Sequence, residues 1–276
     1  MPRAYFDTNI YGSIRAEEVE GLRAQLARRG IVAYLSLSDI EELLGGWKTN
    51  PAAATQRLRV ARDLVGFDNI LKQPNDLLAD AIRAYAVGQS QPSQLLSGDQ
   101  REIIIDALRR IALGDTNIDH VVSKFVDDVK RRKEEFGLEM AQASARARAE
   151  WELIPAERRR TVTFGEYLAA GARQWAEAFA AHIGLADACR ERELDGLLNV
   201  RTVWVCVGAT MSWIYSLVVG DYGQPRQPEP QDVYDLWHAL LASAADVFVT
   251  RDRKLADLLE RVPINGFRVV RSLDAL

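Results

Sequence analysis

The sequence predicts an α/β fold with a central parallel sheet, interrupted by a large all-helical insertion. Strand and helix patterns alternate at both ends of the chain, whereas helical periodicity dominates between about residues 66 and 200. Neither end carries enough strands to bury a parallel sheet alone, so the two ends must share one sheet. We therefore expect residues 1–65 plus 201–276 to form an α/β domain and residues 66–200 to form the insertion.

The N-terminal segment predicts a strand, a helix, a second strand and a second helix. Their expected ranges are 4–6, 17–29, 31–35 and a helix up to residue 44. Gly30 is a typical residue for the end of the first helix, and Ser36 or Ser38 is expected to cap the second. The first strand is apolar and leads directly into Asp7, which it would carry to its carboxyl end.

The middle of the chain predicts helices with few strand signals. The expected helices cover residues 119–136, 139–151, 164–183 and 185–198, and a loop rich in Ser, Gln and Pro is expected over 89–98. Because 203–220 has eighteen residues without a formal charge, it reaches the lower limit for a membrane span. We interpret it as a buried helix, since a span would place Asp7 and Asp235 on opposite sides of a bilayer.

Strand and helix patterns return after an irregular connector over residues 220–232, which holds three prolines. The expected elements are a helix over 232–244, a strand over 246–250, a helix over 253–261 and a strand over 267–270. Two further acidic residues flank this strand: Asp235 comes early in the preceding helix, and Asp252 follows the strand closely.

Composition narrows the class of protein. The 276-residue chain has a net charge of −4 and a pI near 5.6, which does not indicate a nucleic-acid binder, although a cluster of metal-binding acids lowers the formal charge. The two cysteines, Cys189 and Cys206, exclude a disulfide framework and a cysteine-rich zinc site. With no apolar signal-like stretch at the N-terminus, we expect a cytoplasmic protein without a membrane anchor.

Four acidic residues are expected at one edge of the sheet: Asp7, Glu42, Asp235 and Asp252. Ligands of open α/β sheets bind outside the carboxyl ends of the strands, and these four acids follow strands or lie about one helical turn from that edge. Close carboxylates repel each other and recruit cations, and oxygen ligands favour Mg²⁺ or Mn²⁺. Two such ions, about 4 Å apart, are a common device for displacement at phosphorus.

The motifs around these acids resemble those of the PIN-domain family. The resemblance consists of Tyr5-Phe6-Asp7-Thr8-Asn9, of Ser36 with Glu42-Leu43, of Asp235-Leu-Trp-His238, and of Thr250-Arg251-Asp252. It covers roughly residues 4–50 and 230–276. The sequence departs from compact family members in the long interval between Glu42 and Asp235, which the helical insertion would fill.

The resemblance implies a PIN-like three-layer fold and a metal-dependent endoribonuclease. Members of the family hydrolyse RNA with Mg²⁺ or Mn²⁺, leaving a 5′-phosphate and a 3′-hydroxyl, and some are toxins of toxin–antitoxin pairs. The expected partners are therefore an RNA substrate, an antitoxin protein and a second copy of the chain. All four acids would be catalytic residues and metal ligands.

Two of these assignments have a competing residue beside them. Glu41 competes with Glu42, but the step of six residues from Ser36 favours Glu42. Asp232 competes with Asp235 and is interpreted as a residue that caps the helix. Asp252 is itself a candidate helix cap.

Four neighbouring residues are assigned supporting roles. Thr8, Asn9 and Thr250 are expected to orient carboxylates or to contact phosphate. His238, three residues after Asp235, is expected either to be a satisfied buried histidine or to bond to a ligand residue. We do not assign it as a general base.

Basic residues provide candidate phosphate contacts. Arg251, Arg253 and Lys254 flank Asp252 and are the best candidates. The runs over 130–133 and 158–160 are more typical of solvated helix faces.

Two other functions compete with the nuclease hypothesis. One is a catalytically inactive PIN-like module that binds RNA or protein through its helical insertion. The other is a Mg²⁺-dependent phosphatase, which is disfavoured because Asn9 stands where such enzymes usually carry a second aspartate. A P-loop motif is absent from the sequence.

Overall fold

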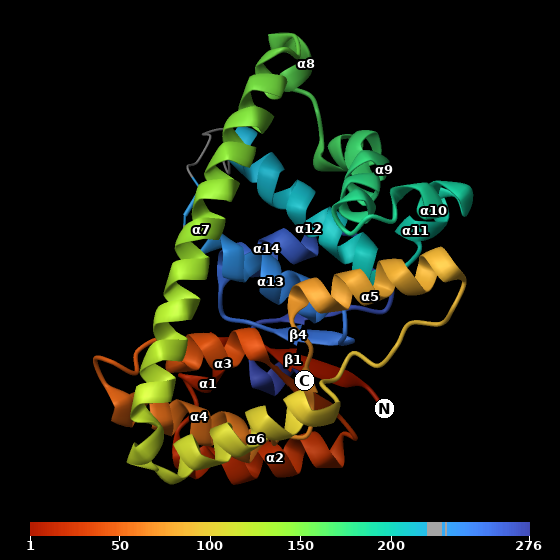
Figure 1. Cartoon of the computed structure of the whole chain (residues 1–276). Coiled ribbons are helices and arrows are strands. Elements are labelled where there is room, and N and C mark those ends of the chain that lie inside the picture. The colour runs from red at the N-terminus through yellow and green to blue at the C-terminus, as the bar shows by residue number, and fades with distance from the viewer. Residues whose placement is uncertain (220–227, 230) are drawn as a thin grey trace.

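The computed structural model describes residues 1–219, 228–229 and 231–276 of the chain (Figure 1). Within these residues, five parallel strands form one sheet in the order β3-β2-β1-β4-β5. The strands are β1 (Arg3–Phe6), β2 (Val32–Ser36), β3 (Ile70–Leu71), β4 (Val247–Val249) and β5 (Arg268–Val270). The predicted α/β class with a parallel sheet is therefore confirmed.

The central strand joins the two ends of the chain. On one side of β1, Ala4 pairs with Ala33 of β2, and on the other it pairs with Val247 of β4. Side chains of β1 alternate between the two faces of the sheet, with Phe6 in one apolar cluster and Tyr5 in the other. Segments at opposite ends of the sequence thus share one core, as the shortage of strands at either end predicts.

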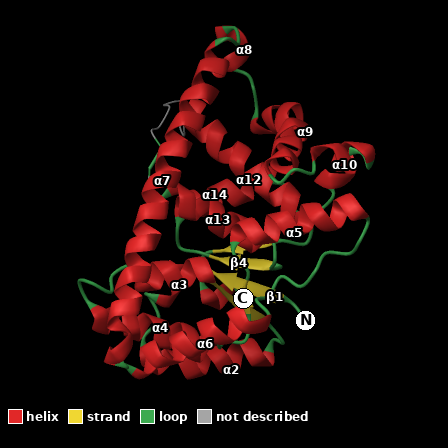
Figure 2. Ribbon diagram, in the orientation of Figure 1, coloured by secondary structure: helices red, strands yellow, loops and turns green. Residues whose placement is uncertain are grey.

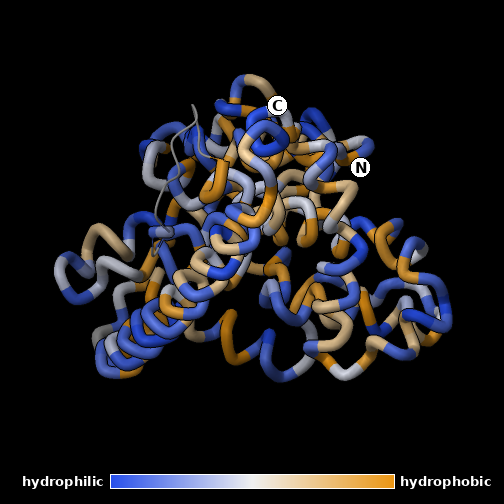
Figure 3. Tube along the Cα trace, turned by 90° about the horizontal axis from the view of Figure 1, so that it is seen from above, coloured by the Kyte–Doolittle hydropathy of each residue, from blue (hydrophilic) through white to orange (hydrophobic). Residues whose placement is uncertain are grey.

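Helices cover both faces of the sheet (Figure 2). The helices are α1 (Thr8–Tyr11), α2 (Val19–Arg28), α3 (Leu37–Leu44), α4 (Pro51–Val65), α5 (Pro74–Val87), α6 (Gly98–Leu113), α7 (Asp119–Glu152), α8 (Ala156–Arg159), α9 (Phe164–His182), α10 (Ala186–Glu191), α11 (Leu194–Leu198), α12 (Arg201–Val218), α13 (Asp232–Ala242) and α14 (Arg253–Glu260). Short 3₁₀ turns cover Ala16–Glu18, Thr116–Ile118 and Leu273–Ala275. In Figure 1, α2, α4 and α6 lie on one side of the sheet, and α12, α13 and α14 lie on the other. Figure 3 shows hydrophilic and hydrophobic residues alternating along the helices, as expected for helices with one buried face.

The edge strand β3 comes from the segment predicted as the helical insertion. Its Ile70 pairs with Leu35 of β2, and Leu71 also forms an antiparallel bridge with Leu95 in the expected loop over 89–98. A strand of two residues is too short to show an alternating pattern, so β3 could not be predicted from its residues. The sheet therefore includes residues from within 66–200, where only helices were expected.

The prediction of two helices over 119–136 and 139–151 is wrong, because one helix, α7, covers both. Gly137 lies inside α7, and a helical glycine costs only about 1 kcal/mol relative to alanine. Buried residues continue on both sides of it, including Val129 and Met140. The burial of these side chains outweighs the small cost of the glycine, so the helix continues through it. Conversely, the single helix expected over 185–198 is two, α10 and α11, separated where Glu193 has a φ of 70°.

The uncharged segment after residue 200 forms the buried helix α12, as expected. It packs against α5, α7, α9, α13 and α14. At Gly208 the fit is so close that a Cβ would lie 2.4 Å from Cγ1 of Val262, so only glycine fits there. Among the described helices, none has the length and apolarity needed to cross a membrane. Most of the predicted connector over 220–232 lies outside the described residues.

Candidate metal centre

Asp7 lies where β1 ends, next to the end of β4. Its backbone N–H donates to the Val249 carbonyl at 2.9 Å, so the pairing of the two strands continues one residue into the site. Three side chains then hold its carboxylate: Thr250 and Asn9 donate to Oδ2, each at 2.5 Å, and Thr8 donates to Oδ1 at 3.3 Å. The carboxylate is 5% exposed and has a fixed orientation at the carboxyl edge of the sheet.

The start of α3 determines which glutamate reaches this edge. Ser36 caps the helix by accepting from the Asp39 N–H, and Asp39 accepts in return from the Ser36 N–H. With this start, Glu42 meets Asp7 through Thr8, whose hydroxyl lies 2.6 Å from Glu42 Oε2. The Gln231 side chain donates to the other oxygen of Glu42 at 2.8 Å.

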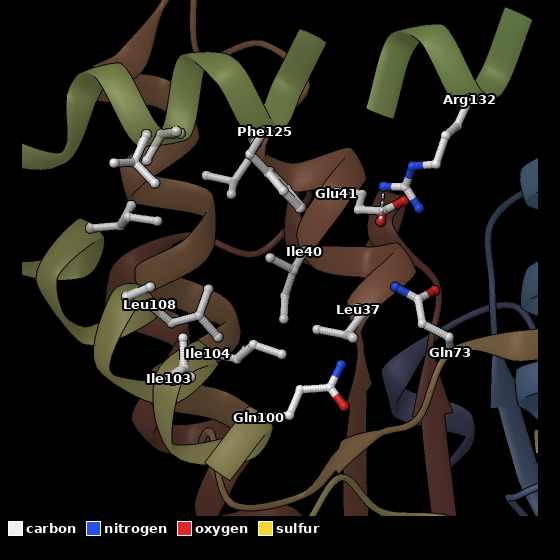
Figure 4. Close-up of a pocket in the computed structure, with 15 residues that line it drawn as sticks. Leu37, Ile40, Glu41, Gln73, Gln100, Ile103, Ile104, Leu108, Phe125 and Arg132 are labelled. Carbon is white, nitrogen blue, oxygen red and sulfur yellow. Dashed lines mark hydrogen bonds and ion pairs between the residues drawn. The ribbon is translucent and has the colours of Figure 1, made fainter. Parts of the chain in front are cut away.

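The neighbouring Glu41 points away from this edge and toward α7. It is 2% exposed and forms an ion pair of 2.8 Å with Arg132 (Figure 4). The pair lies at one end of a largely apolar pocket of about 310 Å³ between α3, α6 and α7. Of the two adjacent glutamates, Glu42 thus lies at the sheet edge and Glu41 contacts the helical segment.

His238 of α13 completes a compact group with Asp7 and Glu42. Its Nε2 lies 2.8 Å from Glu42 Oε2 and 4.0 Å from Asp7 Oδ1. One potential ligand atom from each of these three residues lies within 4.8 Å of the other two. The histidine is 1% exposed, so it is both a buried residue with satisfied nitrogens and a member of the acidic site.

A hydrogen-bond chain behind His238 fixes its ring. Nδ1 lies 2.6 Å from the Tyr5 hydroxyl, which donates to Asp39 Oδ1 at 3.2 Å and lies 3.0 Å from the Ser36 hydroxyl. Burial raises the pKa of Tyr5 well above its ordinary value, and the negative charge of Asp39 adds to this. Tyr5 therefore stays protonated, and its hydroxyl continues to link His238 to Asp39 by hydrogen bonds.

Asp235 and Asp252 lie beside this group, although neither belongs to its three closest members. Asp252 caps α14 by accepting from the Leu255 N–H, and its own N–H donates to the Thr250 hydroxyl at 2.9 Å. Burial raises the pKa of Asp235 to about 7, and the charges of Asp252, Asp232 and Asp7 add to the effect. This mutual repulsion indicates that the acids from the two ends of the chain share one electrostatic environment.

Asp232, the competitor of Asp235, opens α13. Its carboxylate accepts from the Glu229 N–H at 2.8 Å, three residues before it. The helix cap is Gln231, so the interpretation of Asp232 as the capping residue is wrong, although it does lie in the first turn. Asp235 lies about one turn further along the same helix, as does His238 beyond it.

The charge on Glu42 and His238 is set by their contact. Burial alone raises the pKa of Glu42, but the hydrogen bond and positive charge of His238 lower it to about 2. Burial lowers the pKa of His238, yet Glu42, Asp39 and Asp7 raise it to about 10. Without a metal ion, the two side chains thus form a buried ion pair near neutral pH.

The acids at this edge lack basic partners among the described residues. In the described part of the chain, no lysine or arginine forms an ion pair with Asp7, Asp235 or Asp252, and one imidazole faces four carboxylates. Such a concentration of negative charge recruits cations, and a set of carboxylates with one imidazole suits a divalent metal ion. The residues present therefore fit the metal that the resemblance implies.

The predicted phosphate contacts lie in the segment that follows β4. Arg251 and Arg253 are exposed, and the Arg251 N–H donates to the Asn9 side chain at 3.2 Å, which links this loop to Asp7. Lys254 pairs with Glu229 at 2.9 Å. In the basic run over 130–133, each side chain contacts a neighbour within the chain, as expected for a helix face.

Two residues of the site, Tyr5 and Gln231, were not predicted from the sequence. Tyr5 had a usable signal, because residues two apart in a strand face the same side, so Tyr5 shares the face of Asp7. Gln231 had none, since its contact with Glu42 depends on how α13 packs against α3.

Comparisons with known proteins give no relative: no family model, no curated protein and no solved structure matches this chain.

Proposed function

We propose that this chain is a metal-dependent endoribonuclease with a PIN-like fold. The observation that carries the proposal is the meeting of Asp7, Glu42 and His238 within 4.8 Å, with Asp235 and Asp252 beside them, at the carboxyl edge of a parallel sheet. These residues come from three segments that are distant in sequence. The motifs that resemble the PIN family lie on the same three segments.

The residues of the chain have separate tasks in this proposal. Asp7 and Glu42 would hold a divalent ion, with Asp235 and Asp252 at its sides. When bound, the ion would supply a water of lowered pKa and polarise the scissile phosphate. The Thr8 hydroxyl lies between the two carboxylates, 2.6 Å from Glu42 Oε2 and 3.3 Å from Asp7 Oδ1, and its one proton can bond to either.

Other residues orient the acid and approach the substrate. Thr250 and Asn9 keep the Asp7 carboxylate in one orientation, which reduces reorganisation during the reaction. The exposed Arg251 and Arg253 would contact RNA phosphates and position the strand.

The test is cleavage of single-stranded RNA in the presence of Mn²⁺ or Mg²⁺, with products examined for 5′-phosphates. Asp7→Asn should lower the cleavage rate by about 100-fold to 1,000-fold, the range seen when one preorganised charge-stabilising group is removed. The matched control is Asp68→Asn, because Asp68 precedes β3 at the opposite edge of the sheet and its side chain is 79% exposed. The control should cleave at the parent rate.

Two outcomes would contradict the proposal. Equal cleavage by the parent and Asp7→Asn would show that the activity arises elsewhere or from a contaminant. RNA binding without metal-dependent cleavage by the parent would favour the inactive binding module. The toxin hypothesis has its own test: expression of the parent alone should arrest growth, whereas expression of Asp7→Asn should not.

A further inference from the structure

We propose that His238 is a nitrogen ligand of the metal ion, so that the site prefers Mn²⁺, Co²⁺ or Zn²⁺ to Mg²⁺. The inference rests on the proposed function in one respect, that the acidic edge binds a divalent ion. It goes further by naming the ligand atom, Nε2 of His238, and the class of metal.

The distances among the three side chains fit one ion. Two ligand atoms with bonds of about 2.1 Å to a metal lie about 3.0 Å apart at a right angle and about 3.4 Å apart in a tetrahedron. His238 Nε2 lies 2.8 Å from Glu42 Oε2 and 4.0 Å from Asp7 Oδ1, which brackets these values. Side-chain rotations that move the Glu42 and Asp7 carboxylate oxygens by a few tenths of an ångström would bring all three ligand atoms to bonding distance from one ion.

The orientation of the ring supports a ligand role. A histidine that binds metal through one nitrogen usually donates the N–H of the other to a fixed partner. Here Nδ1 faces the Tyr5 hydroxyl at 2.6 Å, and Tyr5 in turn donates to Asp39 at 3.2 Å. With the Tyr5 proton directed to Asp39, the hydroxyl accepts from Nδ1–H, and the lone pair of a neutral His238 then lies on Nε2.

Burial restricts what else Nε2 can contact. His238 is 1% exposed, and both potential partners of its Nε2 are carboxylates at the acidic edge. In the metal-free protein this nitrogen contacts Glu42 directly. A metal ion between the same two atoms would replace the Nε2 proton, which is released to solvent, would keep both atoms bonded and would add its charge to a region that holds four carboxylates.

The mixed ligand set determines the preferred ion. Imidazole is a good ligand for the first-row transition metals and zinc, whereas Mg²⁺ strongly favours oxygen and usually retains several waters. A site of carboxylates alone accepts Mg²⁺ readily. The addition of one fixed, buried imidazole therefore shifts the preference toward metals that accept nitrogen.

Pulsed electron paramagnetic resonance of the Mn²⁺-loaded protein tests the ligand directly, because a bound imidazole gives a ¹⁴N modulation. The chain has three histidines, of which His120 and His182 are exposed. The double variant His120→Gln/His182→Gln leaves His238 as the sole histidine. We expect the ¹⁴N modulation in this variant and in the parent. If Mn²⁺ binds and the modulation is absent, the proposal is wrong.

Calorimetric titration with Co²⁺ and Mg²⁺ tests the preference. His238→Gln should weaken Co²⁺ binding by about 10-fold to 100-fold and change Mg²⁺ binding much less. Tyr5→Phe, which keeps the imidazole and removes the hydroxyl behind it, should weaken Co²⁺ binding within the same range, as loss of an orienting partner usually does. His182→Gln should bind both ions like the parent.

The outcomes separate this inference from the proposed function. Equal Co²⁺ affinity in the parent and His238→Gln, combined with loss of binding in Asp7→Asn, would overturn the histidine ligand and leave the acidic metal site intact. No saturable binding of either ion by the parent would overturn both.

Discussion

The acidic residues at the two ends of strands β1 and β4 differ in whether basic side chains neutralise them. At their amino ends, Arg3 is the first residue of β1 and Asp246 precedes β4, and the two side chains form an ion pair of 3.0 Å. Arg201 lies 3.7 Å from the same aspartate. At their carboxyl ends lie Asp7 and Asp252. Among the described residues, no lysine or arginine forms an ion pair with either of them.

The difference distinguishes an acid that stabilises the fold from acids available to a ligand. Arginine at the amino end lowers the pKa of Asp246, chiefly through the hydrogen bond from Arg3. At the carboxyl end, burial and neighbouring acids raise the pKa of Asp235. One pair of strands thus carries compensated charge at one edge and uncompensated charge at the other, where substrates of parallel sheets bind.

Matched substitutions of the acids before and after β4 should show the largest difference in the rate of RNA cleavage. Asp252→Asn should lower RNA cleavage by about 100-fold or more, the cost of removing one preorganised group from a reaction centre. Asp246→Asn should leave the rate per folded molecule within about twofold, since its carboxylate contacts Arg3 at the opposite edge. Equal losses of activity in the two variants would remove the functional distinction between the edges.

Metal ions should stabilise the protein through the carboxyl edge alone. At a free Mn²⁺ concentration 100 times the dissociation constant, the free energy of unfolding should rise by about 2.7 kcal/mol. Asp7→Asn should lose this increase, and Asp246→Asn should keep it. Chemical denaturation with Mn²⁺ and with a chelator measures both. An increase that survives in Asp7→Asn would place the ion elsewhere.

Removing one acid from the carboxyl edge should stabilise the metal-free protein. The folded-state pKa of Asp235 is raised to about 7 from 3.8, so the folded state binds the proton more tightly and loses stability as pH rises between these values. Asp235→Asn removes that penalty and should gain about 1–2 kcal/mol at pH 8. The gain should shrink toward pH 4. The measurement is chemical denaturation of the parent and Asp235→Asn between pH 4 and pH 8, with a chelator present. A gain in unfolding free energy that is the same at every pH would contradict the raised pKa of Asp235.

Removing the acid at the amino edge should have the opposite and smaller effect. The pKa of Asp246 is lowered from 3.8, so its contribution is present above that value and is lost as pH falls below it. Asp246→Asn should cost about 1 kcal/mol at pH 7, because the pair is partly exposed and screened. The loss should disappear in acid. A stabilised Asp246→Asn variant at pH 7 would contradict the compensating role of Arg3.

The strands that carry the site were predictable because each leaves a local pattern. Apolar runs of three to five residues located β1, β2 and β4, and the residue after such a run lies at the carboxyl edge, as Asp7 does. The cap at Ser36 fixed the phase of α3 and hence the direction of Glu42. These features depend on interactions within a few residues, which a sequence displays directly.

The remaining features depend on contacts between distant segments. The Tyr5–His238 hydrogen bond joins residues 233 positions apart, and nothing local in either segment indicates it. β3 exists because β2 offers it a hydrogen-bonding edge, and its two residues carry no pattern of their own. The continuity of α7 through Gly137 likewise reflects the surfaces that the helix covers.

The Arg132–Glu41 contact limits how far the chain can be shortened. A chain without residues 66–200 would retain all four acids of the edge. It would also remove α7, which supplies Arg132 to the Glu41 carboxylate and covers this side of α3, together with the edge strand β3. Shortening the protein therefore requires new polar residues on the uncovered face of α3 and a replacement strand beside β2.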